Sequence, residues 1–242
     1  MAAAKFPTTL LFSPNFVITA GAVLFRRSTS SSSSSPPNVL EVCILYHETK
    51  GHWLLAKGRK DRGESVEDAA IRETFEETGY PCRLMSGLQM WTRAPPPGSQ
   101  TKDSAALVSN AIEPFAVTMR TVGPTNVKFT WWYIAEWTGE PKQDGTQTLS
   151  ESFTSEFVSV DTALKRLTFE TDREVVEKAA KIVLESDHAK LSYVSLSSPS
   201  MILFLNLLCF KQKWKWNHVE ELELVLFFFP DNLDFSFSLL PK

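Results

Sequence analysis

One short acidic segment carries the residues whose types and spacing are best suited to chemistry. Five residues separate Gly58 from Glu64, and seven more precede the run RETFEETG. On a helix with about 100° per residue, the three glutamates of that run, Glu73, Glu76 and Glu77, fall within an arc of about 100°. Like charges repel at this spacing, whereas a divalent cation would turn the repulsion into ligation. Carboxylate oxygens suit Mg2+ or Mn2+, which also bind phosphate oxygens, and an ordinary solvated acidic helix is the alternative.

The residues around the glutamates suggest how such a site would be built. Arg72 lies four residues before Glu76 and reaches the same helix face, where a guanidinium orients a carboxylate rather than binding a cation. Gly58 and Gly63 bracket the preceding loop, and their lack of side chains lets a backbone carbonyl and Glu64 approach. The predicted metal ligands are Glu73, Glu76, Glu77, Gly58 and Glu64, and the predicted catalytic residues are Glu73, Glu76, Glu77 and Arg72.

Four cations just before this helix are the candidates for substrate binding: Lys57, Arg59, Lys60 and Arg62. Four positive charges within six residues would attract a polyphosphate. A solvated charged loop explains them equally well.

Two later segments offer further candidates. In the aromatic run, a period of two sends Trp131 and Tyr133 to one face and Trp132 to the other. One ring could stack on a base, although aromatic residues in a covered sheet are more often core. Glu151 and Glu156, in an acidic loop, are the candidates for a general base, with plain solvation as the alternative.

Hydrophobic patterning predicts the elements that must position these residues. Strands are expected at 15–27, 38–47, 53–56 and 128–137, and residues 57–63 are expected to form a turn. Ser65 with Asp68 predicts a helix N-cap and Gly79 predicts the end of that helix. Apolar residues spaced by three and four predict a second helix over 159–185. This order of elements predicts an α/β fold in which helices cover a sheet.

Composition limits the partners and the compartment. The 25 basic and 28 acidic residues give a net charge of −3, so no nucleic acid or anionic lipid partner is expected. Three widely spaced cysteines indicate neither disulfides nor a zinc site, which favours a reducing compartment, the cytoplasm or the nucleus. The longest apolar run, 201–210, is far shorter than the 20 or so residues needed to cross a bilayer, so no transmembrane segment is expected. The oligomeric state is left open.

Texture along the chain predicts three parts. Residues 1–14 are an N-terminal extension without a secretory signal, and 15–190 are the catalytic domain with a Ser/Pro surface loop at 28–37. Residues 191–242 are a C-terminal extension that is expected to pack loosely or to be poorly ordered. A membrane-surface or partner-binding segment is the alternative reading of that extension.

The acidic segment resembles the signature of the Nudix hydrolases, G-x5-E-x7-R-E-U-x-E-E-x-G-U, where U is aliphatic. The resemblance implies an α/β/α sandwich with a mixed sheet, and a site in which the matching carboxylates and the Gly58 carbonyl hold magnesium. Thr74 and Tyr80 depart from the pattern by occupying aliphatic positions. The Arg-Glu-Thr variant is similar to branches of the family that act on diadenosine polyphosphates and diphosphoinositol polyphosphates.

The resemblance implies a metal-dependent hydrolase that cleaves a pyrophosphate bond in a nucleoside-diphosphate-linked or polyphosphate small molecule. Bound magnesium would neutralise the polyphosphate and lower the pKa of the attacking water. The alternative is a non-catalytic module of the same fold that senses a nucleotide, although the complete set of carboxylates favours chemistry.

Overall fold

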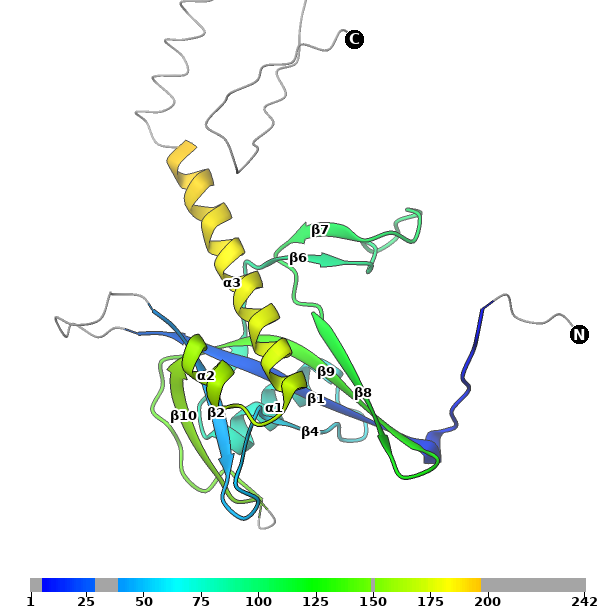
Figure 1. The fold of residues 1–242 in the computed structure, drawn as a ribbon. Helices are drawn as coiled ribbons and strands as arrows, with labels where there is room; N and C mark the ends of the chain where they lie inside the picture. The colour runs from blue at the N-terminus through cyan, green and yellow to red at the C-terminus, as the bar shows by residue number, and fades with distance from the viewer. Residues whose placement is uncertain (1–5, 29–38, 149–150, 197–242) are drawn as a thin grey trace, which may run out of the picture. The chain divides into compact units, whose positions relative to one another are not determined.

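The computed structural model describes residues 6–28, 39–148 and 151–196 (Figure 1). Every strand, with α1 and α2, belongs to one compact unit that ends at Ala189. The helices are a short 3-10 turn η1 (Ser13–Asn15), α1 (Val66–Thr78), α2 (Val160–Arg166) and α3 (Glu170–Leu196). The strands are β1 (Phe16–Arg27), β2 (Leu40–His47), β3 (His52–Leu54), β4 (Lys57–Arg59), β5 (Cys82–Leu84), β6 (Gln89–Thr92), β7 (Ala106–Ser109), β8 (Ala116–Val122), β9 (Asn126–Trp137) and β10 (Phe153–Ser159).

Eight of these strands form one mixed sheet. Its order is β10-β2-β1-β9-β5, with β3 beside β2, β4 beside β1 and β8 beside β9, while β6 and β7 form a separate hairpin. The two long strands β1 and β9 are parallel and the other pairs are antiparallel. Since β9 occupies one edge of β1, β2 and β4 share the other: β2 pairs near Phe25 and β4 near Ala20.

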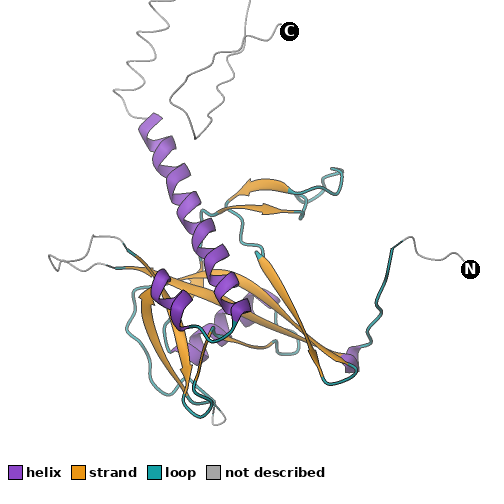
Figure 2. Cartoon of the chain, viewed as in Figure 1, coloured by secondary structure: helices purple, strands orange, loops and turns teal. Residues whose placement is uncertain are grey.

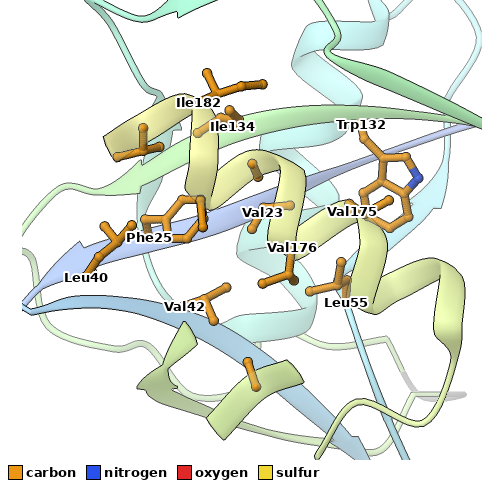
Figure 3. Close-up of a cluster of buried hydrophobic side chains, with 14 of the residues drawn as sticks. Val23, Phe25, Leu40, Val42, Leu55, Trp132, Ile134, Val175, Val176 and Ile182 are labelled. Atoms are coloured by element: carbon orange, nitrogen blue, oxygen red, sulfur yellow. The ribbon is translucent and has the colours of Figure 1, made fainter. Parts of the chain in front are cut away.

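Helices cover both faces of the sheet, as alternation along β1 requires. Ala20, Ala22 and Leu24 pack on α1. Their neighbours Val23 and Phe25 point the other way, into a larger cluster with residues of α2 and α3. Figure 2 shows α1 behind the sheet and α2 and α3 in front of it. In Figure 3 the larger cluster runs from Leu40 and Phe25 at one end to Trp132 and Leu55 at the other. The expected fold, a mixed sheet between two helical layers, is confirmed.

The predicted helix over 159–185 is in fact two helices, and α3 continues to Leu196. Helix α2 ends at Arg166, and Thr168 lies beside β3. Its amide donates to the carbonyl of Trp53 (2.9 Å), and its hydroxyl accepts from the Trp53 amide (2.9 Å). These bonds draw the backbone out of helical pairing, and apolar spacing cannot reveal them because the partner lies 115 residues away.

Two other local predictions are wrong. Residues 57–63 begin with strand β4 rather than a turn, because Lys57 and Arg59 pair with Gly21 and Thr19 of β1. The acidic loop is shorter than expected, because β10 starts at Phe153 and places Glu156 in a strand opposite Ile44.

Some predictions concern residues that the structure does not describe. Residues 29–37 of the Ser/Pro loop and residues 197–242 of the C-terminal extension lie outside the described ranges. The three-part division of the chain therefore stays a prediction. Among the residues that are described, no helix is both long and apolar enough to cross a membrane.

Candidate active site

Helix α1 begins and ends at the residues that the sequence predicts. Ser65 is the N-cap, and its Oγ accepts a hydrogen bond from the amide of Asp68 (3.0 Å). Gly79 is the C-cap with φ 76°, and its amide donates to the carbonyl of Phe75 (2.8 Å). A residue with a side chain would be strained in that left-handed conformation, so glycine stops the helix there.

The helix face that carries the carboxylates is buried rather than exposed. Glu73 and Glu77 are only 7% and 5% exposed. They lie against β4, where a Cβ added to Gly58 would overlap the Glu73 carboxylate. The amide of Lys57 donates to Glu77 Oε2 (2.9 Å). Gly58 is therefore needed for space: any side chain at this position would displace Glu73.

Arg72 is the centre of the hydrogen-bond network around these carboxylates. Its Nη1 donates to Glu73 Oε1 (2.8 Å) and to Glu76 Oε2 (2.9 Å), and its Nη2 donates to the carbonyl of Arg59 (3.0 Å). A two-pronged contact with Glu64 completes the set, at 2.7 Å from Nε and 2.9 Å from Nη2. One planar guanidinium thus orients three carboxylates and the backbone of β4.

Glu64 and Glu76 are held by Arg72 rather than placed among the converging carboxylates. Glu64 also accepts a hydrogen bond from the amide of Asp61 (2.8 Å). The hydrogen bond from Arg72, helped by this bond from Asp61, lowers the pKa of Glu64 to about 2. Within the described part of the chain, the carboxylates that converge are Glu73, Glu77 and Glu151, each with an oxygen within 4.8 Å of the others. Two of the four predicted carboxylate ligands, Glu73 and Glu77, are thus brought together with a glutamate that the sequence suggests only as a base.

Glu151 reaches this site because the segment before it caps the C-terminal end of α1. Thr146 Oγ1 donates to the carbonyl of Glu76 (2.7 Å), and Gln147 Nε2 donates to the carbonyl of Glu77 (3.3 Å). Gln147 also ties this end to β10, through two bonds with the backbone of Phe153 (2.8 and 2.9 Å). Sequence reasoning missed both capping residues, since a side chain that bonds a distant backbone carbonyl leaves no local pattern.

Burial makes the carboxylates poor anions on their own. Desolvation raises the pKa of Glu77 to about 8, against the opposing effect of Lys57. Desolvation also raises the pKa of Glu73, with Arg72 opposing. A cation between these oxygens would offset the cost of ionising them. The donor set is all carboxylate oxygen, which fits Mg2+ or Mn2+ better than softer metals.

The four cations predicted to bind substrate do not all lie in one loop. Lys57 and Arg59 lie in β4, so their side chains share the sheet face opposite to the one that Gly58 presents to α1. Lys60 follows the strand, and its Nζ donates to the carbonyl of Asp61 (2.9 Å). Arg62 is exposed in the turn before α1.

The aromatic strand alternates as predicted. Trp132 belongs to the cluster beneath α2 and α3, while Tyr133 and Trp131 belong to the cluster beneath α1. Both Trp132 and Tyr133 are buried, and the Tyr133 hydroxyl donates to Glu67 (3.1 Å). These two rings are core residues.

Glu156, the other candidate base, lies away from the converging carboxylates. It forms an ion pair with Arg166 of α2, whose guanidinium also lies over the ring of Trp53, 3.8 Å from its centroid.

Thr74, one of the residues that departs from the signature, is fully buried and accepts a hydrogen bond from the amide of Ala22 (3.2 Å). Cys43 and Cys82 are free thiols.

Comparison with known proteins gives a family match over most of this unit. A family model described as a NUDIX domain matches residues 20–179. The chain is 35% identical over 89 residues to an 8-oxo-(d)GTP phosphatase of Mycolicibacterium smegmatis, which covers 36% of this chain and 28% of that protein. It is 49% identical over 41 residues to a putative 8-oxo-dGTP diphosphatase of Bacillus subtilis, covering 17% and 28%. The chain thus spans little more than a quarter of the length of these curated relatives. Among solved structures, a C. elegans Ap4A hydrolase complex matches 70% of this chain and 98% of its own, with 17% identity and a TM-score of 0.44.

Proposed function

The chain belongs to the Nudix family, and we propose that it is a pyrophosphohydrolase that uses a divalent cation to cleave a phosphoanhydride bond in a nucleoside-diphosphate-linked or polyphosphate substrate. The observation that carries this proposal is the convergence of Glu73, Glu77 and Glu151 beside the side-chain-free Gly58. Relatives named as phosphatases and diphosphatases support an enzyme rather than a nucleotide sensor.

The proposal gives each residue of the site a role. Glu73, Glu77 and Glu151 would hold Mg2+ or Mn2+, which when bound supplies charge neutralisation at the phosphate and a more acidic water. Arg72 keeps the carboxylates in position and holds β4 against α1 through its bond to the Arg59 carbonyl. Gly58 leaves the space next to Glu73 free.

Glu151 is the better candidate of the two for accepting a proton from the attacking water. Its carboxylate lies with Glu73 and Glu77, whereas Glu156 is occupied by Arg166. A base must come within hydrogen-bond reach of the proton that it removes. Glu156 keeps a structural role between β10 and α2.

The specific substrate belongs to the proposal as well. Diadenosine polyphosphates and diphosphoinositol polyphosphates are supported by the Arg-Glu-Thr variant of the signature, and 8-oxo-dGTP is supported by the names of the relatives. All three place several phosphates next to one another, which fits a site beside the basic residues Lys57 and Arg59 of β4. Residence in the cytoplasm or nucleus is supported by the two free thiols.

A substrate panel with two matched variants tests the assignment. Phosphate or nucleotide release is measured with Mg2+ for diadenosine tetraphosphate, diphosphoinositol polyphosphate, 8-oxo-dGTP, ADP-ribose and NADH. We expect turnover of at least one, a loss of about 100-fold or more in Glu151→Gln, and a change of only a few fold in Glu156→Gln. Absence of turnover with every substrate, at saturating Mg2+ and Mn2+, would favour the nucleotide-sensing module.

A further inference from the structure

Strand register brings together three basic side chains on the sheet face opposite α1. Arg59 of β4 is opposite Thr19 of β1, and Thr19 is opposite Thr130 of β9. Two residues along β9 and on the same face, Lys128 is directly opposite Arg120 of β8. The three cations thus come from three strands, β4, β9 and β8, and β1 lies between β4 and β9.

The face is identified by what neighbouring side chains touch. A Cβ added to Gly21 would meet the Lys57 side chain (2.7 Å) and the ring of Trp132 (3.0 Å). Trp132 packs beneath α3, so Lys57 and Arg59 lie on the α3 side. With strands about 5 Å apart, the backbones of β4 and β9 are about 10 Å apart across β1, which long Arg and Lys side chains can bridge from both sides.

In the part of the chain that the structure describes, no carboxylate forms an ion pair with these cations. Within residues 6–28, 39–148 and 151–196, the ion pairs include none with Arg59, Arg120 or Lys128. Lys128 is partly buried, and burial is the largest cause of its lowered pKa. The positive charges of Lys57, Arg120 and Arg59 lower this pKa further. A half-buried lysine surrounded by other cations is unfavourable unless an anion joins it.

Hydroxyl groups, together with Val17 opposite Lys128, form the floor between the cations. The hydroxyls of Thr19 and Thr130 lie 2.7 Å apart, and Thr118 accepts a hydrogen bond from Trp132 Nε1 (3.3 Å). Asp172 of α3 is buried and accepts a hydrogen bond from the amide of Leu55 (3.4 Å). Burial raises the pKa of Asp172, and the charge of Lys57 opposes that rise. The face around Arg59, Arg120 and Lys128 therefore presents positive charge and hydroxyls beside Val17.

Strand β4 connects this face to the candidate active site. The backbone of β4 forms hydrogen bonds on the side of the candidate active site. The Lys57 amide donates to Glu77, and the Arg59 carbonyl accepts from Arg72. The side chains of Lys57 and Arg59 lie on the opposite face of the sheet. An anion held by Arg59 is thus one strand away from the carboxylates that would hold the metal.

We propose that Arg59, Arg120 and Lys128 form a phosphate-binding subsite that takes a phosphate group of the substrate remote from the scissile anhydride. This inference rests on the proposed function and narrows the substrate class to molecules with three or more linked phosphates or with phosphate at a second position. A substrate with a single diphosphate, such as ADP-ribose, leaves the subsite empty.

Binding of inorganic tripolyphosphate to the full chain in EDTA tests the subsite without hydrolysis or metal. Isothermal titration at low salt compares the wild type with Arg120→Met and Lys128→Met, which keep the length of the apolar stem and remove the charge. Arg83→Met is the matched control, because Arg83 is an exposed cation of β5 paired with Glu136. We expect about tenfold weaker binding in each of the first two variants and no change in the control. Lys128→Arg, which keeps the charge, retains affinity.

Kinetics separate failure of the subsite from failure of the proposed function. For diadenosine tetraphosphate, Lys128→Met raises KM about tenfold with kcat nearly unchanged, while the constants for ADP-ribose stay within twofold. Equal effects on both substrates, or tripolyphosphate affinity that falls as much in Arg83→Met, would overturn the subsite and leave the hydrolase assignment intact. A chain that hydrolyses nothing, yet loses tripolyphosphate binding only in the two subsite variants, would keep the subsite and reject the hydrolase.

Discussion

Replacing Glu77 with Gln separates the role of this carboxylate in metal binding from its cost to the fold. The side chain is 5% exposed, and burial raises its pKa from an ordinary value of 4.5 to about 8. A carboxyl whose pKa is higher in the folded state than in the unfolded state makes folding less favourable as pH rises between the two values. Its full contribution to stability is present below pH 4.5 and is lost by about pH 8.

The size of this effect follows from the two pKa values. At about 1.4 kcal/mol for each pKa unit, ionised Glu77 lowers the free energy of unfolding at pH 9 by up to about 5 kcal/mol in the absence of metal. Gln has the same shape, can accept the bond from the Lys57 amide, and carries no charge beside the carboxylates of Glu73 and Glu151. We therefore expect Glu77→Gln to be more stable than the wild type at pH 9 by about 2 to 5 kcal/mol, with little difference at pH 4.5.

Guanidinium unfolding in EDTA at pH 4.5 and pH 9 measures the stability difference, and titration with Mg2+ at pH 8 measures metal affinity. Metal affinity and turnover should fall by orders of magnitude, because a ligand charge is lost. Glu185→Gln on the exposed side of α3 is the control and should change stability by less than about 0.5 kcal/mol. A variant less stable than the wild type by the same amount at both pH values, or one that binds Mg2+ normally, would refute the reasoning.

Three other substitutions probe the support of the site. Gly58→Ala should lower the melting temperature and turnover together, because the new Cβ overlaps the Glu73 carboxylate. Gly63→Ala is the control, since open space surrounds Gly63 and only the strain of its positive φ should lower stability. Equal melting temperatures of the two variants would contradict this reasoning. Arg72→Ala should weaken Mg2+ binding less than Glu77→Gln does, since it acts through orientation, and equal losses in titration would show otherwise. Gln147→Ala should cost about 1 to 3 kcal/mol of stability and lower kcat, measured by unfolding and turnover, because it leaves the Phe153 amide without its partner; unchanged kcat would mean that Glu151 does not depend on this contact.

Local interactions explain why helix α1 could be predicted so closely. The Ser65 cap, the Gly79 stop and the arc of glutamates all depend on neighbours within a few residues, so residue type and spacing are sufficient. The long strands β1 and β9 are similarly marked by β-branched and aromatic residues. The two-helix structure of 160–196 was not predictable in this way, because Thr168 bonds a strand more than a hundred residues earlier.

The sequence by itself determined which chemical groups are present: an acidic helix with one arginine, a glycine before it, and cations nearby. Only the tertiary structure decided which of these groups meet. Packing of α1 on β4 buries Glu73 and Glu77, raises their pKa values, and leaves Glu64 and Glu76 to Arg72. Capping of the helix by Thr146 and Gln147 brings in Glu151, and strand register gathers Arg59, Arg120 and Lys128 on one face. The physical reason is that burial and charge proximity depend on contacts between residues far apart in the chain, which spacing along the sequence does not encode.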